Sequence, residues 1–330
     1  MTAPAIATVT GTVHPEDLGR TLMHEHLLIA YPGAESDTIR PGPSAEERFS
    51  ICVDRIEEMK DLGFRSMLDP CPADLGRDVE LMARVAQKTG FQIICATGLY
   101  KEAEGGAAYW KFRNAFSPSV EGMTELFVHE LTEGIGSTGI RAGIIKVATG
   151  PGRMSDYERM VFEAAARASL ATGAPITTHT DQGTVGDVQQ RLLTELGVPA
   201  NRIVIGHSCG TSDGEYHLTI ARGGSYLGFD RFGLDMLHPD EERIRSLVRL
   251  LRAGAGDRVV VSHDSVWCWR GEPAPRAVLE ALTETWNPGH FTLRIAPRLR
   301  AEGIAEEAIE ALLVDNPRRF FAGEKLPPLS

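Results

Sequence analysis

The sequence predicts an α/β fold: a single (β/α)8 TIM barrel. Eight short apolar runs alternate with amphipathic, helix-patterned stretches along the 330 residues. The runs are almost continuously apolar, which is typical of parallel strands covered by helices. Eight strand–helix units within ~250 residues indicate a closed barrel. An open, doubly wound sheet is the alternative, but it would usually show a glycine-rich phosphate loop after the first strand, where this chain has HEHLLIAYPG.

The predicted elements follow one another in a regular order. The strands are expected at residues 20–26, 64–70, 91–98, 142–149, 175–180, 202–208, 225–230 and 258–264. Clear amphipathic helices are expected at residues 45–63, 77–90, 156–173 and 240–254, and each of these stretches ends in glycine, as a helix C-cap prefers. The alternation of strand and helix therefore runs through the whole predicted barrel.

The two ends of the chain extend this pattern. Residues 5–19 alternate in polarity like a short β-hairpin ahead of the barrel, and a long loop, residues 265–290, follows the eighth strand. Two helix-like stretches close the chain, ending in ALLVDNPRRFF. We expect one domain over residues 1–330, with the barrel at about 19–321.

Composition narrows the class of partner. The net charge is -11 and the isoelectric point is near 5.4, which argues against nucleic acid or an anionic membrane as a partner. No apolar run approaches the ~20 residues of a membrane span, and the first residues lack the pattern of a signal peptide. Five cysteines without CxxC spacing suggest reduced thiols in a cytoplasmic protein.

Metal-binding side chains stand at the ends of several predicted strands. They are His24 and His26 on the first strand, Lys146 near the end of the fourth, and His179, His207 and Asp264 at the ends of the fifth, sixth and eighth. Alternate residues of a strand share a face, so His24 and His26 should point the same way. Because functional groups cluster at the carboxyl ends of barrel strands, we expect all six at one mouth.

The chemistry of this set indicates two metal ions. Imidazole and carboxylate ligands suit Zn, Fe, Mn, Co or Ni, and one catalytic zinc needs only three protein ligands. Burial and nearby cations lower a lysine pKa, which makes the neutral amine available. A neutral Lys146 amine can react with CO2 to form a carbamate, that is N6-carboxylysine, which would be a bridging anion between two divalent ions.

These motifs together resemble the phosphotriesterase family of the amidohydrolase superfamily. The matching pieces are MHEH at 23–26, GIIKVAT at 143–149, APITTHT at 174–180, RIVIGHS at 202–208, FDRFGLD at 229–235 and SHD at 262–264. They occur in the order of the family, and the resemblance extends over nearly the whole chain.

The resemblance implies a hydrolase with two divalent ions, zinc first. In that arrangement His24, His26 and Asp264 would hold one ion, His179 and His207 the other, and carboxylated Lys146 would bridge them. A hydroxide between the ions would attack the substrate, and Asp264 would take up the proton. The resemblance also suggests a homodimer.

The substrate expected from the resemblance is a lactone. Members of the lactonase branch have a tyrosine after the third strand and an arginine after the seventh, matched here by Tyr100 and Arg231. We predict both as catalytic and substrate-binding residues, with Trp267 and Trp269 lining an apolar subsite. Secondary activity on phosphotriesters is expected, and a dedicated organophosphate triesterase or a carboxylesterase is the alternative.

Structural roles are the competing interpretation for each residue. A histidine can be a core residue, Lys146 could form a buried ion pair, and Asp264 could cap a helix. Tyr100, Arg231 and the tryptophans could serve packing alone. Asp69 and Asp230 also end strands, and we interpret them as structural hydrogen-bonding groups.

Two other classes of function remain open at this point. GHSCG at 206–210 fits the G-x-S-x-G nucleophile elbow of serine hydrolases, with Ser208 as nucleophile and His290 downstream. TSDGEY follows where such an elbow needs a helix, and the interpretation leaves the other histidines and Lys146 unexplained. A non-catalytic homologue is the third class, although every predicted metal position is filled.

Overall fold

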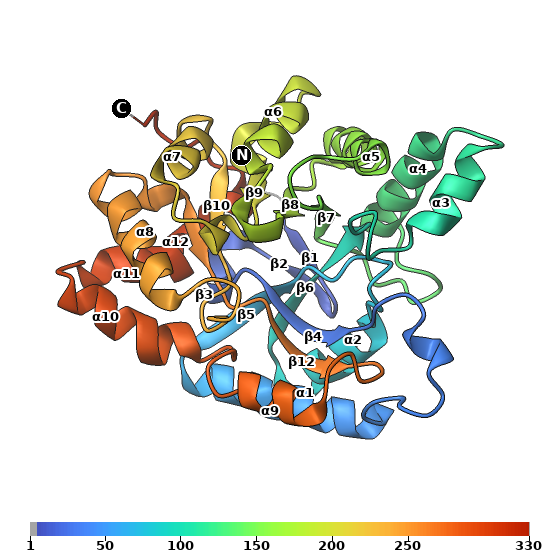
Figure 1. Cartoon of the computed structure of the whole chain (residues 1–330), viewed down its shortest axis with the longest axis horizontal. Coiled ribbons are helices and arrows are strands. Elements are labelled where there is room, and N and C mark those ends of the chain that lie inside the picture. Colours follow the sequence, from blue (N-terminus) through green and yellow to red (C-terminus); the bar gives the residue numbers. More distant parts are fainter. Residues whose placement is uncertain (1–4, 330) are drawn as a thin grey trace.

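A computed structural model gives the structure of the protein and describes residues 5–329. Eight parallel strands form one sheet in the order β11-β10-β9-β8-β7-β6-β5-β3 (Figure 1). They are β3 (Arg20–Leu22), β5 (Phe64–Asp69), β6 (Gln92–Gly98), β7 (Ile144–Ala148), β8 (Ile176–His179), β9 (Ile203–Ile205), β10 (Tyr226–Phe229) and β11 (Val259–Val261). Each lies within a predicted run, so the predicted fold class is confirmed.

The sheet curves into a nearly closed barrel. Its terminal strands, β3 and β11, are joined just beyond β3, where the Met23 amide donates to the Val261 carbonyl at 3.5 Å. A second bond follows, from the Asp264 amide to the His24 carbonyl at 2.9 Å. These bonds bring the ends of the first and last strands together, and with them two predicted metal ligands.

Helices surround the strands (Figure 1). They are α1 (Ala45–Asp61), α2 (Val79–Thr89), α3 (Ala107–Asn114), α4 (Ser119–Thr132), α5 (Asp156–Thr172), α6 (Gly186–Glu195), α7 (Gly214–Arg222), α8 (Asp240–Arg252), α9 (Arg276–Leu282), α10 (Ala296–Ala301), α11 (Glu306–Leu313) and α12 (Asp315–Ala322). Ser44 and Ser155 begin α1 and α5 with capping boxes, in which a serine and the glutamate three residues later satisfy each other's amides. Gly90 and Gly173 end α2 and α5 in left-handed conformation.

The strand side chains form two separate apolar layers. Outward residues such as Ile145, Val147 and Ile205 pack against the helices. Inward residues such as Ile144 and Val204 fill the barrel interior. Because side chains alternate along a strand, Lys146 shares the inward face with Ile144.

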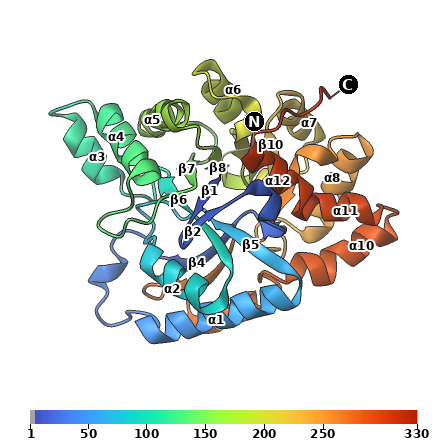
Figure 2. The ribbon, with the colours of Figure 1, turned by 180° about the vertical axis from the view of Figure 1, so that it is seen from behind.

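The predicted amino-terminal hairpin is present as β1 (Ile6–Thr8) and β2 (Gly11–Val13), paired antiparallel. Ile6 and Val13 pack in the same apolar cluster as the inward strand residues, together with Phe320 and Phe321 of α12. Figure 2 shows the hairpin in front of the sheet in the view from behind. The hairpin and α12 therefore cover one end of the barrel interior.

Two predicted boundaries were wrong. The first strand does not run through residues 20–26: β3 ends at Leu22, and a new strand, β4 (Glu25–Ile29), begins after a bend. The segment after the eighth strand is not only a loop, because it contains β12 (Ser265–Trp269) and α9. β12 pairs in parallel with β4, so a second, two-stranded sheet continues beyond the barrel. This long-range pairing has no signature in local periodicity.

Within residues 5–329, no helix has both the length and the apolar character needed to cross a membrane.

Candidate metal centre

Lys146 lies inside the barrel near the carboxyl end of β7. Its side chain is 2% exposed, and its Nζ is 3.0 Å from Nε2 of His24. β6 ends close beside it at Gly98, where an added Cβ would lie 1.8 Å from the Lys146 carbonyl oxygen. Glycine at this position therefore lets the third strand approach the lysine closely.

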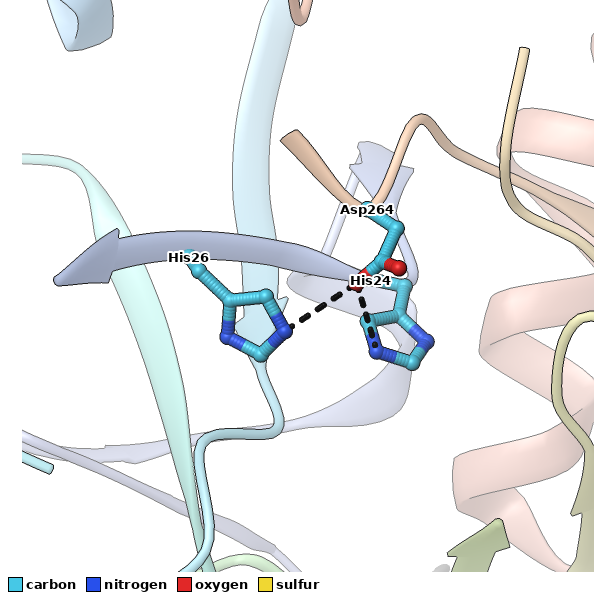
Figure 3. Close-up of side chains that lie close together, drawn as sticks. All are labelled: His24, His26 and Asp264. Carbon is cyan, nitrogen blue, oxygen red and sulfur yellow. Dashed lines mark ion pairs between the residues drawn. The ribbon is translucent and has the colours of Figure 1, made fainter. Parts of the chain in front are cut away.

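His24, His26 and Asp264 come from the β3–β4 bend, from β4 and from the turn after β11. The Asp264 Oδ1 atom is 3.4 Å from Nε2 of His24 and 3.2 Å from Nε2 of His26 (Figure 3). Asp264 has a left-handed backbone, with φ of 54°, which is uncommon for a residue other than glycine. The turn before β12 holds this conformation and aims the carboxylate between the two imidazoles.

Buried carboxylates hold three of the histidines from the opposite side of each ring. Nδ1 of His24 is 3.0 Å from Asp230 Oδ2, and Nδ1 of His207 is 2.9 Å from Asp230 Oδ1. Nδ1 of His26 is 3.0 Å from Asp69 Oδ1. The interpretation of both aspartates as structural hydrogen-bonding groups matches these contacts. Such carboxylate–histidine pairs fix the ring and leave Nε2 facing the site.

His179 ends β8, His207 follows β9, and the two lie together. Their ring centroids are 4.5 Å apart. His207 also has a positive φ, of 56°, after β9. Its buried Nε2 has no hydrogen-bond partner among residues 5–329. The Tyr100 hydroxyl is 3.3 Å from Nδ1 of His179, which places the predicted tyrosine beside this pair.

Arg231 contacts Asp264 directly. Its Nε donates to Asp264 Oδ2 at 2.9 Å, so the two oxygens of this carboxylate face different partners. Burial raises the pKa of Asp264, but the neighbouring His207 and Arg231 hold it well below its usual range. The carboxylate is therefore ionised throughout the neutral pH range.

The protonation of the nitrogens suits metal ligands at most positions. Burial, reinforced by the charge of Lys146, lowers the pKa of His24 to about 3. Burial also lowers the pKa of His179 and of His207. Burial opposes the charge on His26 as well, but hydrogen bonds to Asp264 and Asp69 raise its pKa to about 9. His26 would therefore have to release a proton on binding a cation.

Burial is also the main influence on Lys146, and it lowers the lysine pKa to about 8. Near neutral pH roughly a tenth of the amine is then neutral, against roughly one part in three thousand at the ordinary value. The neutral amine is the form that can react with CO2.

The donor set fits divalent ions. One oxygen or nitrogen from each of His24, His26 and Asp264 lies within 4.8 Å of the others, and the same holds for His24, His207 and Asp230. The unpartnered Nε2 of His207 and the amine-to-imidazole contact of Lys146 are arrangements that a cation and a carbamate would satisfy. These clusters could therefore hold metal.

A cavity of about 150 Å³ opens on these side chains. All six predicted ligands line it, together with Tyr100, Arg231 and Trp269, and with the apolar residues Ile29, Pro72, Leu75, Leu234 and Val266. Tyr31 and Trp286 also line it, and the sequence analysis did not identify them.

Trp267 does not line this cavity, which is a correction to the predicted subsite. It lines an adjoining groove of about 610 Å³, which shares Val266, Trp269 and Trp286 with the cavity, and its indole nitrogen donates to Ser265 Oγ at 3.0 Å. Alternation along β12 would place Trp267 and Trp269 on one face, so the sequence pattern held no signal for this difference.

Glu25 is a second residue that the sequence analysis missed. It is fully buried, and its Oε1 accepts bonds from the Ser262 hydroxyl at 2.7 Å and from the amide and Nδ1 of His263. Its Oε2 accepts from the amide and hydroxyl of Ser265. Glu25 lies between the two predicted ligand histidines, and it therefore connects the start of β4 to the turn that contains Asp264. The alternation of HEH was the available signal that it points away from them.

Lys101 and Asp181 form a further support for His179. Asp181 Oδ1 is 2.9 Å from Nε2 of His179 and also accepts from Lys101 Nζ at 2.9 Å. Lys101 is 5% exposed, although its sequence surroundings are polar. The burial arises from the fold of the loops after β6 and β8.

Ser208 does not have the geometry of a nucleophile. It is fully buried, and its hydroxyl donates to the Ile205 carbonyl at 2.7 Å. The imidazole of His290 instead contacts Asp240, 2.7 Å away. The Ser208 hydroxyl therefore has a backbone partner in place of a catalytic base, and the serine-hydrolase interpretation is excluded.

Comparison with known proteins agrees with this site. The sequence model of the Phosphotriesterase family matches residues 4–321. An aryldialkylphosphatase from Saccharolobus solfataricus is 32% identical, with 94% of this chain and 97% of that protein aligned. An organophosphorus hydrolase from Deinococcus radiodurans superposes with a TM-score of 0.92 at 40% identity, covering 97% of this chain and 99% of that one. A mutant of a PTE-like lactonase from the same bacterium gives 0.91 at 40% identity, covering 96% and 99%.

These relatives are hydrolases of esters, and they align over nearly the full length of the barrel. The match extends from the hairpin to α12 and includes every strand end described above. The chain belongs to the phosphotriesterase family and is a metal-binding hydrolase that acts on ester bonds.

Proposed function

We propose that the protein is a lactonase that uses two divalent ions, zinc first and Co, Mn or Fe as alternatives, with secondary activity on phosphotriesters. The observation on which this proposal depends is the placement of Tyr100 and Arg231. Both line one small cavity with the six predicted ligands. A hydroxyl and a guanidinium thus flank the position that a substrate carbonyl would occupy.

The size of the cavity supports a lactone over a triester. At about 150 Å³ it is smaller than the ~300–1,000 Å³ of typical ligand sites. A lactone presents a planar carbonyl in one compact ring. A phosphotriester presents a tetrahedral phosphorus with three ester arms, which need more room around the reacting atom.

The proposed ligands are His24, His26 and Asp264 for one ion and His179 and His207 for the other, with N6-carboxylysine at Lys146 between them. When bound, two divalent ions would polarise the ester and lower the pKa of water. The carbamate would form when the neutral Lys146 amine attacks CO2: an N–C bond forms, one C=O π bond opens to give a carboxylate oxygen, and an amine proton is released.

The remaining steps of the reaction are assigned to side chains that line the cavity. Asp264 would accept the proton of the attacking water, and Arg231 holds its second oxygen in place at 2.9 Å. The Tyr100 hydroxyl would donate a hydrogen bond to the alkoxide released as the ring opens. Trp269 and the apolar wall would hold the ring and exclude bulk water.

A dedicated organophosphate triesterase is the second candidate, favoured by the likeness to a protein described as an organophosphorus hydrolase. A panel of γ- and δ-lactones compared with an aryl dialkyl phosphate separates the two candidates. The lactonase proposal expects kcat/KM to favour lactones by tenfold or more, equivalent to ~1.4 kcal/mol, and expects a chelator to abolish turnover. A preference for the triester would contradict it and support the second candidate.

Two broader features are also proposed. All five cysteines are free thiols, which fits a reducing, cytoplasmic location.

A homodimer is proposed as well, and the exposed aromatic side chains Tyr109, Phe112 and Phe116, on and just after α3, are consistent with a contact surface. Light scattering of the purified protein would test it, and a monomeric mass at micromolar concentration would contradict it.

A further inference from the structure

Two cysteines far apart in the sequence face each other beside the candidate site. Cys52 lies on α1 and Cys268 on β12, and their Sγ atoms are 4.0 Å apart. Their exposed fractions are 0% and 2%. The thiols of Cys71 and Cys95 instead contact backbone carbonyls, and Cys209 packs in the apolar core. The Cys52–Cys268 pair is therefore set apart by its sulfur-to-sulfur contact.

The two thiols differ in accessibility and in acidity. Cys268 lines the groove of about 610 Å³ whose walls come from α1, β12 and α9, and Cys52 does not, so a small oxidant would meet Cys268 first. The sulfur-to-sulfur contact with Cys52, helped by the guanidinium groups of Arg48 and Arg55, lowers the pKa of Cys268. The same contact, together with burial, raises the pKa of Cys52. Cys268 is thus the more reactive thiol.

The pair is connected to the candidate metal centre through β4. The Cys52 thiol donates to the Leu27 carbonyl at 3.6 Å, and Cys268 pairs with Leu28 across the β4–β12 ladder. The Leu27 amide in turn donates to Asp69 Oδ2 at 2.9 Å, and Asp69 is the carboxylate that holds His26. β12 also places Trp269 in the catalytic cavity. A change at the cysteines would therefore reach both the histidine support and the cavity wall.

We propose that Cys52 and Cys268 form a reversible disulfide when the protein meets a peroxide, and that this bond lowers turnover. The Cys268 thiolate attacks one oxygen of hydrogen peroxide, the O–O bond breaks, and hydroxide takes up the thiol proton to leave as water. The Cys52 sulfur then attacks the resulting sulfenic acid, and the S–O bond breaks to release a second water. Two thiols are oxidised by two electrons and one peroxide is reduced.

The geometry gives the expected effect on the site. A disulfide has a length of ~2.05 Å, so the two sulfurs must approach by about 2 Å from their separation of 4.0 Å. This movement draws β12 towards α1, and it removes the bond from Cys52 to Leu27. Trp269 shifts with its strand, and His26 loses part of its support.

The test treats the reduced, metal-loaded full chain with hydrogen peroxide. We expect free thiols to fall from five to three (the five cysteines minus the bridged pair). A peptide crosslinked between Cys52 and Cys268 should appear, and kcat/KM should fall at least threefold and recover with dithiothreitol. Cys268→Ala, which keeps the bond from Cys52 to Leu27, should keep the activity of the reduced protein and lose this reversible response, whereas Cys95→Ala, a matched buried control, should keep both.

Several results would overturn the proposal. Oxygen added to Cys268 without a crosslink would exclude the disulfide, and a crosslink that leaves kcat/KM unchanged would exclude its effect on turnover. If Cys268→Ala fails to fold, as circular dichroism would show, Cys268→Ser provides the same comparison. The crosslink is detected by mass and does not depend on which ester is the substrate, so its failure is distinct from a failure of the proposed function.

Discussion

At the scale of single residues, Lys146 is the position where local chemistry and function meet most closely. The lysine lies between Ile145 and Val147 of a buried strand. Its ammonium form is disfavoured there, because burial removes the hydration of the charge. Within residues 5–329 its amine forms no ion pair and contacts an imidazole nitrogen 3.0 Å away, which cannot neutralise an ammonium. The side chain therefore destabilises the fold as a cation, and a carbamate that binds metal would give it a role.

Replacing Lys146 should separate stability from metal binding. The folded pKa of about 8 lies below the ordinary 10.5, so the charged amine opposes folding below pH ~8, and this penalty disappears as the pH rises towards 10.5. Lys146→Met should stabilise the chelator-treated protein by on the order of 3 kcal/mol at pH 7 and much less at pH 10. The same variant should lose metal and nearly all activity.

Urea denaturation at the two pH values and metal analysis measure these effects. Lys111→Met, which replaces a lysine with a 56% exposed side chain, is the control and should change neither stability nor metal content appreciably. A Lys146→Met protein that is less stable at pH 7, or that retains full metal, would be incompatible with this explanation.

Tyr100 is the residue whose proposed role depends most on the substrate. Its hydroxyl is 3.3 Å from Nδ1 of His179, and burial raises its pKa well above the ordinary value, so it remains a donor across the working pH range. Tyr100→Phe should lower kcat for lactones by about 10–100-fold while the metal content stays the same. Tyr109→Phe, at an exposed position on α3, is the control. Equal activity of Tyr100→Phe and the parent protein would remove the proposed donor.

At the scale of elements, the pairing of β4 with β12 shapes the site more than the barrel strands alone. These strands continue the first and last barrel strands into a separate two-stranded sheet, with Ser265 opposite Glu25 and Val266 opposite His26. Glu25 joins them through bonds from Ser262, His263 and Ser265. The bend at Met23–His24 and the turn at Asp264 are held by this connection.

Glu25→Gln tests the connection. The amide group would face donors that now meet a carboxylate oxygen, so we expect a loss of stability of about 1–3 kcal/mol and weaker binding of the ion assigned to His24, His26 and Asp264. Chemical denaturation and metal titration provide the two measurements. Glu57→Gln, at a half-exposed side chain of α1, is the matched control. Unchanged metal affinity in Glu25→Gln would leave Glu25 with a purely structural role.

The difference between what the sequence could and could not predict lies at this scale. Lys146 and His179 were predictable because strand alternation and the ends of parallel strands are local rules that survive folding. The β4–β12 pairing, the burial of Lys101 and the outward position of Trp267 depend on contacts between segments far apart in the chain. The partners of Asp69 and Asp230 belong to the same class, since only the closed barrel brings them beside the histidines.

At the scale of the whole molecule, one barrel interior connects nearly every element. The hairpin at Ile6 and Val13 and the helix at Phe320 and Phe321 pack in the same cluster as the inward strand residues. We therefore predict a single domain over residues 1–330, with one cooperative thermal transition. Scanning calorimetry of the metal-loaded protein would check this, and two well-separated transitions would contradict it.

The central claim is that six side chains from five strand ends form one site for two ions. The most direct measurement is a titration of chelator-treated protein with zinc or manganese in bicarbonate buffer, with lactone turnover followed at each step. Turnover should reach its plateau at two ions per chain, and it should fall when bicarbonate and CO2 are removed before loading. A plateau at one ion per chain, or full turnover in the presence of chelator, would contradict the account.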